Sequence, residues 1–347
     1  MGVSHEVRRP FFLIPFTVHL NVPISPLEAI PEHPGKDAGI DLFVKRDDLL
    51  HPEIQGNKWR KLAPVLAQVR KSYPGGIITF GGPFSNHLEA VAAAGRVFGI
   101  RTFGIVRGKH ANPDNPTLRA ARQNGMMLFP ISKREYDDCK NRGEALIGRE
   151  FPRYYILPEG GATWMAVESC TCITWEIITQ LQQIMPMKRS NRPLYICVSA
   201  GTGCTAAGIV DGFDVKKGQV LVFPVVNKGF DPPAILRLLD ETALRTQAEM
   251  SELERRFSII RDYEFGGFAK LHRPVLDFVD SFREQTGILL DPVYTSKMMF
   301  GVYDMLRHGA FLPGSTVVAV HTGGLQGWDG FKERYGYVPP NPVRPPQ

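Results

Sequence analysis

The chain has 347 residues, of which 43% are hydrophobic and 22% charged, and its formal net charge is +6. This composition is that of an ordinary globular protein and argues against a disordered or membrane-embedded chain. No apolar run approaches the length needed to cross a bilayer. Lys and Arg are scattered among acidic residues, so the positive charge favours small anions over nucleic acid as partners. The length predicts two lobes, each with its own core.

The cysteines and the N-terminus both bear on the cellular compartment. The five cysteines are Cys139, Cys170, Cys172, Cys197 and Cys204. Their odd number and the absence of CxxC spacing argue against a disulfide framework and against a zinc site. Arg8-Arg9-Pro10 precedes only a brief apolar run with no small-residue cleavage site after it, which does not fit a signal peptide. We therefore expect a cytoplasmic protein with no metal site.

The first informative stretch in chain order is Gly56-Asn57-Lys58, at the start of a predicted amphipathic helix. A lysine amine becomes a useful nucleophile when its surroundings lower its pKa, and such lysines form Schiff bases with carbonyl compounds. In isolation, Lys58 would more simply be a solvated residue at a helix start. Its interpretation depends on whether the rest of the chain supplies the other parts of a site.

From about residue 75 onward, short apolar runs alternate with helix-length segments, which is typical of α/β architecture with parallel sheets. The predicted strands cover residues 77–80, 102–106, 127–131, 154–157, 194–198, 220–226 and 316–320. Glycine pairs or Gly-x-Gly follow the first, fourth, fifth and seventh of them. Ligands of parallel sheets bind beyond the carboxyl ends of the strands, so these loops predict one shared site.

The helix after the first glycine loop has readable ends. Ser85 or Asn86 can cap its N-terminus, apolar and small residues recur at helical spacing, and Gly99 stands where a left-handed C-terminal residue is expected. From this pattern alone, capping is a sufficient role for Ser85.

A second loop has the composition of an anion site. Residues 199–208 follow an apolar strand and open a helix of small residues, Ser-Ala-Gly-Thr-Gly-Cys-Thr-Ala-Ala-Gly. Small residues let backbone N–H groups approach a phosphate, and a helix N-terminus favours negative charge. The glycine spacing departs from the dinucleotide-binding GxGxxG pattern, and no Gly-Lys-Ser/Thr of a Walker loop is present.

Two late motifs carry further polar groups. One is Asp291-Pro-Val-Tyr294-Thr295, and the other is His321-Thr322-Gly-Gly. A tyrosine most often lines a core with a satisfied hydroxyl, and a lone histidine is more often structural than catalytic. The ending at residues 338–347 is too rich in proline for regular structure and is either a frayed tail or an extended strap.

In this order, the motifs resemble the pyridoxal-phosphate enzymes of the tryptophan synthase β-subunit fold, specifically the 1-aminocyclopropane-1-carboxylate deaminase and D-cysteine desulfhydrase family. The resemblance covers residues 44–327. It implies a large cofactor domain from residues 1–61 and 163–347, a small α/β domain from residues 62–162, and a site in the cleft between them. It also suggests a homodimer.

The resemblance implies a role for each motif. Lys58 would hold pyridoxal 5′-phosphate as a Schiff base, and Asn86 would bind the ring hydroxyl. Either Thr295 or Thr322 would face the pyridine nitrogen. The 5′-phosphate would be held by Gly201, Thr202, Gly203, Cys204 and Thr205. The substrate would be bound by Ser85, Asn86, His87 and Tyr294, and the catalytic residues would be Lys58, Ser85 and Tyr294.

Departures from the family pattern indicate the reaction. Deaminases of the family have Ser-Asn-Gln in the first loop and Tyr-Glu after Asp-Pro-Val, whereas this chain has His87 and Thr295. A neutral threonine makes a weaker electron sink than a carboxylate would, which suits β-elimination with a good leaving group. A second family tyrosine is replaced by Phe265, and Ala162-Thr163 stands where Ser-Asn is usual.

We therefore predict D-cysteine desulfhydrase-like β-elimination on a small amino acid, giving pyruvate, ammonia and sulfide. The alternatives are 1-aminocyclopropane-1-carboxylate deamination and a pyridoxal-phosphate-binding protein without turnover. A nucleotide-dependent oxidoreductase is a more distant alternative.

Overall fold

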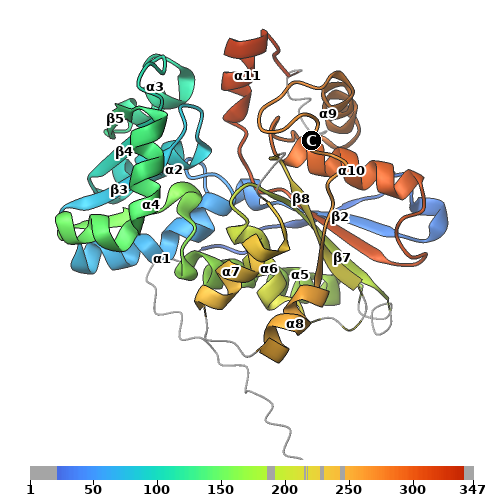
Figure 1. Ribbon diagram of the computed structural model, residues 1–347. Helices are drawn as coiled ribbons and strands as arrows, with labels where there is room; N and C mark the ends of the chain where they lie inside the picture. The colour runs from blue at the N-terminus through green and yellow to red at the C-terminus, as the bar shows by residue number, and fades with distance from the viewer. Residues whose placement is uncertain are drawn as a thin grey trace, which may run out of the picture.

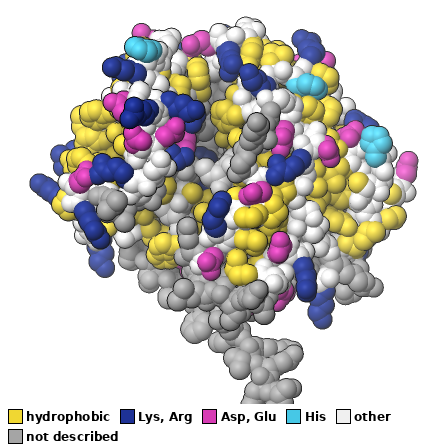
Figure 2. All heavy atoms as spheres, viewed as in Figure 1, with side chains coloured by type: hydrophobic (Ala, Val, Ile, Leu, Met, Phe, Trp, Pro, Cys, Tyr) yellow, Lys and Arg dark blue, Asp and Glu magenta, His cyan; other side chains and the backbone are white. Residues whose placement is uncertain are grey.

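A computed structural model describes residues 22–185, 192–214, 216, 218–226, 230–242 and 247–339 (Figure 1). Residues 8–14 of the N-terminal pattern and residues 340–347 of the proline-rich ending lie outside these ranges. Within them, no helix combines the length and apolarity that a membrane crossing needs. On the face shown in Figure 2, basic side chains are interspersed with acidic ones.

The larger sheet joins both ends of the chain. Its strand order is β1-β2-β10-β7-β8-β9, and every pairing is parallel except that of β1 with β2. The strands are β1 (Leu27–Ile30), β2 (Asp41–Lys45), β7 (Leu194–Ala200), β8 (Gly218–Pro224), β9 (Phe257–Ile259) and β10 (Thr316–Val320). Central parallel strands are covered on both faces, which explains their nearly continuous apolar sequences.

Helices cover both faces of this sheet. In β7, Ile196 and Val198 face one core, while Cys197 between them faces the other. The first core is closed by α5 (Trp164–Ile184), α6 (Cys204–Gly212) and α7 (Pro232–Thr242), and the second by α9 (Arg273–Thr286), α10 (Thr295–Arg307) and α11 (Gly327–Tyr335). Helix α8 (Gln247–Arg255) precedes the edge strand β9.

The smaller sheet uses only the middle of the chain and lies to the left in Figure 1. Its order is β5-β4-β3-β6, with all pairings parallel. The strands are β3 (Gly76–Gly81), β4 (Thr102–Arg107), β5 (Met127–Ile131) and β6 (Tyr154–Leu157). Helices α1 (Asn57–Ser72), α2 (Asn86–Phe98) and α3 (Pro116–Gln123) pack on one face, and α4 (Lys133–Glu150) on the other.

The predicted α/β class with parallel sheets is confirmed, and all seven predicted strands are present. The strand predicted at residues 220–226 begins and ends two residues earlier. Three strands were not predicted, β1, β2 and β9. Of these, β1 and β9 are short edge strands with half-exposed residues, and the apolar run of β2 is only three residues long between Asp41 and Lys45. The domain boundary at residues 61/62 stays a prediction, since α1 runs across it.

A buried ion network holds the start of α1 against the larger sheet and α5. The Arg60 guanidinium is fully buried and donates to both carboxylate oxygens of Asp47, at 2.7 and 2.8 Å, and to both of Glu176, at 2.7 and 2.9 Å. Lys45 pairs with Glu176 at 2.6 Å, and Ser25 donates to Asp47. Two cations thus balance two carboxylates. Burial alone would raise the pKa of Asp47, but Arg60 and its hydrogen bonds hold it below the usual range.

Replacing Arg60 by leucine would leave Asp47 without its ion pair and two buried carboxylates to share the single charge of Lys45. We expect Arg60→Leu to lower the free energy of unfolding by about 3–5 kcal/mol, measured by urea denaturation at pH 7. Lys71→Ala, an exposed substitution on the same helix, is the control and should change it by no more than about 0.5 kcal/mol.

The pH dependence of this difference has a definite sign. The folded-state pKa of Asp47 lies below its unfolded value near 4, so its contribution is present above pH 4 and lost as pH falls further. The difference between wild type and Arg60→Leu should therefore shrink on acidification. A difference that grows below pH 4 would contradict this account.

Candidate functional site

The turn before Lys58 touches a loop 266 positions later in the chain. Gly56 has φ 61° and ψ −138°, and the Asn57 N–H donates to the Thr322 carbonyl at 3.1 Å. A Cβ placed on Gly56 would lie 1.9 Å from that carbonyl oxygen. Only glycine permits so close an approach. The contact sets Lys58 beside the loop of Thr322, Gly323 and Gly324.

The Lys58 amine is poised as a nucleophile. It lies 3.2 Å from Asn57 Oδ1, and the Asn57 amide in turn donates to Thr205 Oγ1 at 2.9 Å. Removal of the amine from water, and then the neighbouring Lys61 charge, lower its pKa to about 7. A large fraction of the amine is therefore uncharged near neutral pH, which carbonyl addition requires.

The predicted anion loop connects β7 to α6. Gly203 caps α6 in the left-handed conformation, at φ 87°, and Thr202 packs against Gly160 of the 3-10 helix η3 (Glu159–Gly161). The first N–H groups of α6 have no intrahelical acceptors, which suits a phosphate. Cys204 is buried, and burial raises the pKa of its thiol. Its predicted contact with a phosphate would therefore come from its backbone.

Lys61 was not singled out in the sequence, and it supplies a charge for that anion. The side chain is buried, and its amine has a single hydrogen bond among the described residues, a long one of 3.4 Å to the Gly160 carbonyl. No carboxylate of the described chain pairs with it. An unpaired buried ammonium is costly, so an anion is expected here. Its i,i+3 spacing from Lys58, on one helix face, was the available signal.

The predicted carboxylate loop opens α2. Ser85 is the N-cap, and its hydroxyl accepts from the Leu88 N–H at 3.4 Å. The Asn86 amide lies against Gly324, where a Cβ would come within 3.0 Å of its Nδ2. The N-terminus of α2 thus faces the loop that contacts Lys58.

The hydrogen bonds of His87 define its tautomer. Thr79 donates to the Leu157 carbonyl at 2.9 Å, so the Thr79 oxygen accepts from His87 Nε2–H at 2.8 Å. His87 Nδ1 is then an unprotonated acceptor, buried beside Gly161 with no partner in the described chain. Burial, with Lys58 and Lys61 nearby, holds the His87 pKa well below its usual value. A neutral acceptor cannot bind a carboxylate, so the backbone and Ser85 are better placed for that task than this ring.

The two candidate threonines differ in whether the hydroxyl proton already has a hydrogen-bond acceptor. Asp291 accepts from the N–H groups of Val293, Tyr294 and Thr295, at 2.6–2.9 Å, and from the Thr295 hydroxyl at 2.7 Å. The Thr295 oxygen also accepts from the Asp291 N–H. The Thr295 hydroxyl proton is therefore committed to Asp291. The Thr322 hydroxyl has no such partner among the described residues, so Thr322 is the better candidate to face a pyridine nitrogen.

Tyr294 and His321 complete the arrangement. The Tyr294 phenol lies against Gly201, where an added Cβ would come within 3.3 Å of its oxygen. Burial raises the pKa of this phenol, so it stays protonated. His321 donates from Nε2 to the Leu289 carbonyl at 2.8 Å and accepts from the Gly323 N–H at Nδ1. His321 therefore shapes the Thr322 loop and is structural, as the sequence favoured.

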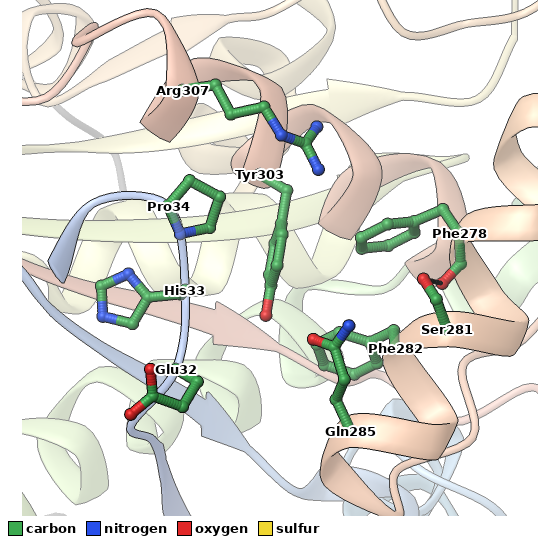
Figure 3. A pocket seen from close by; sticks show the side chains of 9 residues that line it. All are labelled: Glu32, His33, Pro34, Phe278, Ser281, Phe282, Gln285, Tyr303 and Arg307. Atoms are coloured by element: carbon green, nitrogen blue, oxygen red, sulfur yellow. Dashed lines mark hydrogen bonds between the residues drawn. The ribbon is translucent and has the colours of Figure 1, made fainter.

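One cavity borders the candidate site, and a second lies away from it. A cavity of about 140 Å³ is bordered by Thr202 of the anion loop and by Glu159 and Pro158. A cavity of about 320 Å³ lies between α9, α10 and the turn after β1, with Tyr303 at its centre and Arg307 at one end (Figure 3). None of the predicted site residues lines the second one. The convergence of loops, more than cavity size, marks the candidate site.

Comparisons with known proteins agree with this geometry. The family described as pyridoxal-phosphate dependent enzymes matches residues 18–323. The bifunctional D-cysteine desulfhydrase/1-aminocyclopropane-1-carboxylate deaminase of Arabidopsis thaliana is 29% identical, over 85% of this chain and 75% of that protein. A D-cysteine desulfhydrase of Klebsiella pneumoniae is 26% identical, over 86% and 91%. The crystal structure of an ACC deaminase homologue superposes with a TM-score of 0.72 at 25% identity, covering 90% and 93%. The resemblance inferred from the motifs is confirmed.

Adding a Cβ atom at Gly56 tests whether its close approach to Thr322 positions Lys58. A second glycine with positive φ controls for the backbone strain that any side chain would cause there. Gly56→Ala should reduce pyridoxal-phosphate affinity at least about tenfold, measured by fluorescence titration, because the clash with Thr322 displaces Lys58. Gly99→Ala is the matched control, because Gly99 also has positive φ but its Cβ would meet nothing within 4 Å. It should cost about 1 kcal/mol of stability and leave affinity unchanged. Equal affinity losses in both variants would refute the steric explanation.

The lowered pKa of Lys58 predicts how cofactor uptake depends on pH. The rate at which the cofactor-free protein combines with pyridoxal phosphate should rise as pH increases through about 7 and level off above it, because only the free amine adds to the aldehyde. Stopped-flow absorbance measures this rate. An ordinary lysine, with a pKa near 10.4, would show a rate still rising at pH 9.

Proposed function

Because the chain belongs to the family of pyridoxal-phosphate dependent enzymes, we propose that it catalyses β-elimination on a small amino acid, with D-cysteine as the leading substrate. The observation that carries the proposal is the convergence of the low-pKa Lys58 amine, the anion loop with its unpaired Lys61, and a neutral Thr322 hydroxyl. The names of the Arabidopsis and Klebsiella relatives support the choice of substrate.

The residues present fit the cofactor. Lys58 would bind its aldehyde carbon, while the N-terminus of α6 and Lys61 would hold its phosphate. Asn86 would bind the ring hydroxyl, and Thr322 would face the ring nitrogen. When bound, pyridoxal phosphate supplies an electron sink for negative charge at the substrate α-carbon.

The protein's own groups would position the substrate and move its proton. Ser85 and the first N–H groups of α2 would hold the substrate carboxylate, where the helix N-terminus favours an anion. The Lys58 amine would then remove the α-proton. Tyr294, kept protonated, can donate a hydrogen bond to the departing group.

The nature of the group at the ring nitrogen favours elimination of a thiolate. Both carboxylate oxygens of Asp291 accept hydrogen bonds inside its own turn, so the neutral Thr322 hydroxyl would meet the ring nitrogen. With a neutral hydroxyl at the ring nitrogen, the cofactor would be a weaker electron sink than with a carboxylate there. A weaker electron sink suits β-elimination of a good leaving group such as a thiolate. The Cβ–S bond breaks with its electron pair going to sulfur, and hydrolysis of the remaining fragment gives pyruvate and ammonia. Overall, D-cysteine and water yield pyruvate, ammonia and hydrogen sulfide.

A second candidate is the deamination of 1-aminocyclopropane-1-carboxylate, favoured by the second activity in the name of the Arabidopsis relative. Its product, 2-oxobutyrate, separates it from pyruvate formation. A third candidate is cofactor binding without turnover, suggested by Phe265 and Ala162. We further propose a cytoplasmic homodimer; the five free cysteines support a reducing compartment, and the homodimer rests on the family resemblance.

The purified protein should be yellow, and borohydride should fix the cofactor onto Lys58, detected by peptide mass spectrometry. It should release pyruvate from D-cysteine, assayed against L-cysteine and 1-aminocyclopropane-1-carboxylate. Lys58→Ala should lower kcat about 10²–10⁴-fold, because the proton acceptor is lost. Lys71→Ala, exposed on the same helix, should match wild type. A colourless protein would refute the proposal, and a yellow one silent across the panel would favour binding without turnover.

A further inference from the structure

Two phenylalanines of the loop after β9 point in different directions. The Phe265 ring stacks on His272, with centroids 4.4 Å apart, and meets Phe300 edge-on at 5.3 Å. The Phe268 ring instead meets Tyr294 edge-on at 5.9 Å. Phe265, which the family resemblance places at the second tyrosine, is therefore packed against His272 and Phe300. Phe268 is the loop residue that reaches the site.

The loop is held firmly in this orientation. The buried Lys297 amine donates to the carbonyls of Glu264 and Gly267, at 2.8 and 2.6 Å. The Tyr335 hydroxyl donates to the Ala269 carbonyl at 3.0 Å. Phe265 and Ala269 are the non-glycine residues with positive φ, 46° and 52°, in the described chain. Such strained backbone persists only where its surroundings determine it, and it concentrates at functional sites.

No second phenol of this loop is available at Tyr294. The Tyr263 hydroxyl, the nearest alternative in sequence, donates to Asp304 at 2.8 Å. The neighbour of Tyr294 is therefore an apolar ring, and Phe268 keeps 44% of its surface exposed. Such a ring gains from being covered by an apolar ligand group. Sulfur also makes favourable contacts with aromatic ring edges.

We propose that Phe268 is a specificity-determining residue that forms an apolar wall beside Tyr294, selecting amino acids whose β-substituent is a thioether, such as S-methylcysteine, over serine. The inference rests on the proposed β-elimination. A serine hydroxyl would meet an apolar ring with no second donor to assist its departure. A thioether would cover the exposed ring and leave as a thiolate: the Cβ–S bond breaks, sulfur keeps the electron pair and is protonated to methanethiol, and water completes the release of pyruvate and ammonia.

The test compares substrates and ring variants. Pyruvate release gives kcat/KM for cysteine, S-methylcysteine and serine, each in both enantiomers. Wild type should prefer S-methylcysteine to serine at least about tenfold. Phe268→Ala should reduce that ratio about two- to tenfold, the size of a sulfur–aromatic contact. Phe268→Tyr, which restores a hydroxyl, should shift the ratio toward serine. Phe265→Leu is the control and should lower the melting temperature without moving the ratio.

A binding measurement separates this inference from the proposed reaction. In the Lys58→Ala background, which lacks the proton acceptor, calorimetry of the cofactor-loaded protein should show S-methylcysteine bound about two- to tenfold more weakly after Phe268→Ala. An unchanged ratio and affinity in Phe268→Ala, or an equal shift in Phe265→Leu, would overturn the role of Phe268. Absence of pyruvate from every substrate would instead count against β-elimination, while the affinity comparison would still decide whether Phe268 contacts the ligand.

Discussion

The site depends on one backbone contact, between the turn at Gly56 and the carbonyl of Thr322. That contact joins the start of α1 to the loop after β10, two segments from opposite ends of the chain. It is possible because β2 and β10 are parallel neighbours in the larger sheet, so the segments that follow them leave the same edge. Lys58, Thr322 and Gly324 are brought together by this register, and Asn86 reaches Gly324 from the smaller sheet.

The first turn of α1 carries three cationic side chains, of which Arg60 and Lys61 are buried and Lys58 is half-buried. Arg60 is compensated by Asp47 and Glu176, so its burial stabilises the packing of α1 on α5 and the larger sheet. On the opposite side, Lys58 and Lys61 have no carboxylate partner among the described residues. Desolvation, and then the neighbouring Lys61 charge, lower the pKa of Lys58. The same helix thus carries a compensated ion network and two lysines that we propose to serve the cofactor.

Residues that the sequence motifs left equivalent have different surroundings in the folded chain. The Thr295 hydroxyl bonds within the Asp291 turn, whereas the Thr322 hydroxyl has no such partner among the described residues. Ser85 caps α2 and His87 lies in its first turn, yet the His87 ring bonds to Thr79 of β3. Phe265 stacks on His272, whereas Phe268 meets Tyr294 edge-on. The hydrogen bonds and ring contacts formed in the folded chain decide each case.

The sequence alone determined the α/β class, seven of the strands, the C-terminal glycine of α2 and the family. These follow from local periodicity, from glycine and cap chemistry, and from the order of motifs, all of which are written along the chain. Only the tertiary structure decided which threonine is free, which histidine nitrogen is protonated, that Lys61 is an unpaired buried cation, and which phenylalanine meets Tyr294. Those properties depend on desolvation and on the partners that each side chain finds in the folded chain, as far away as Gly160 is from Lys61, and the sequence patterns do not encode them. The short strands β1, β2 and β9 escaped prediction for a related reason, since their pairing in the sheet, more than their own sequences, makes them strands.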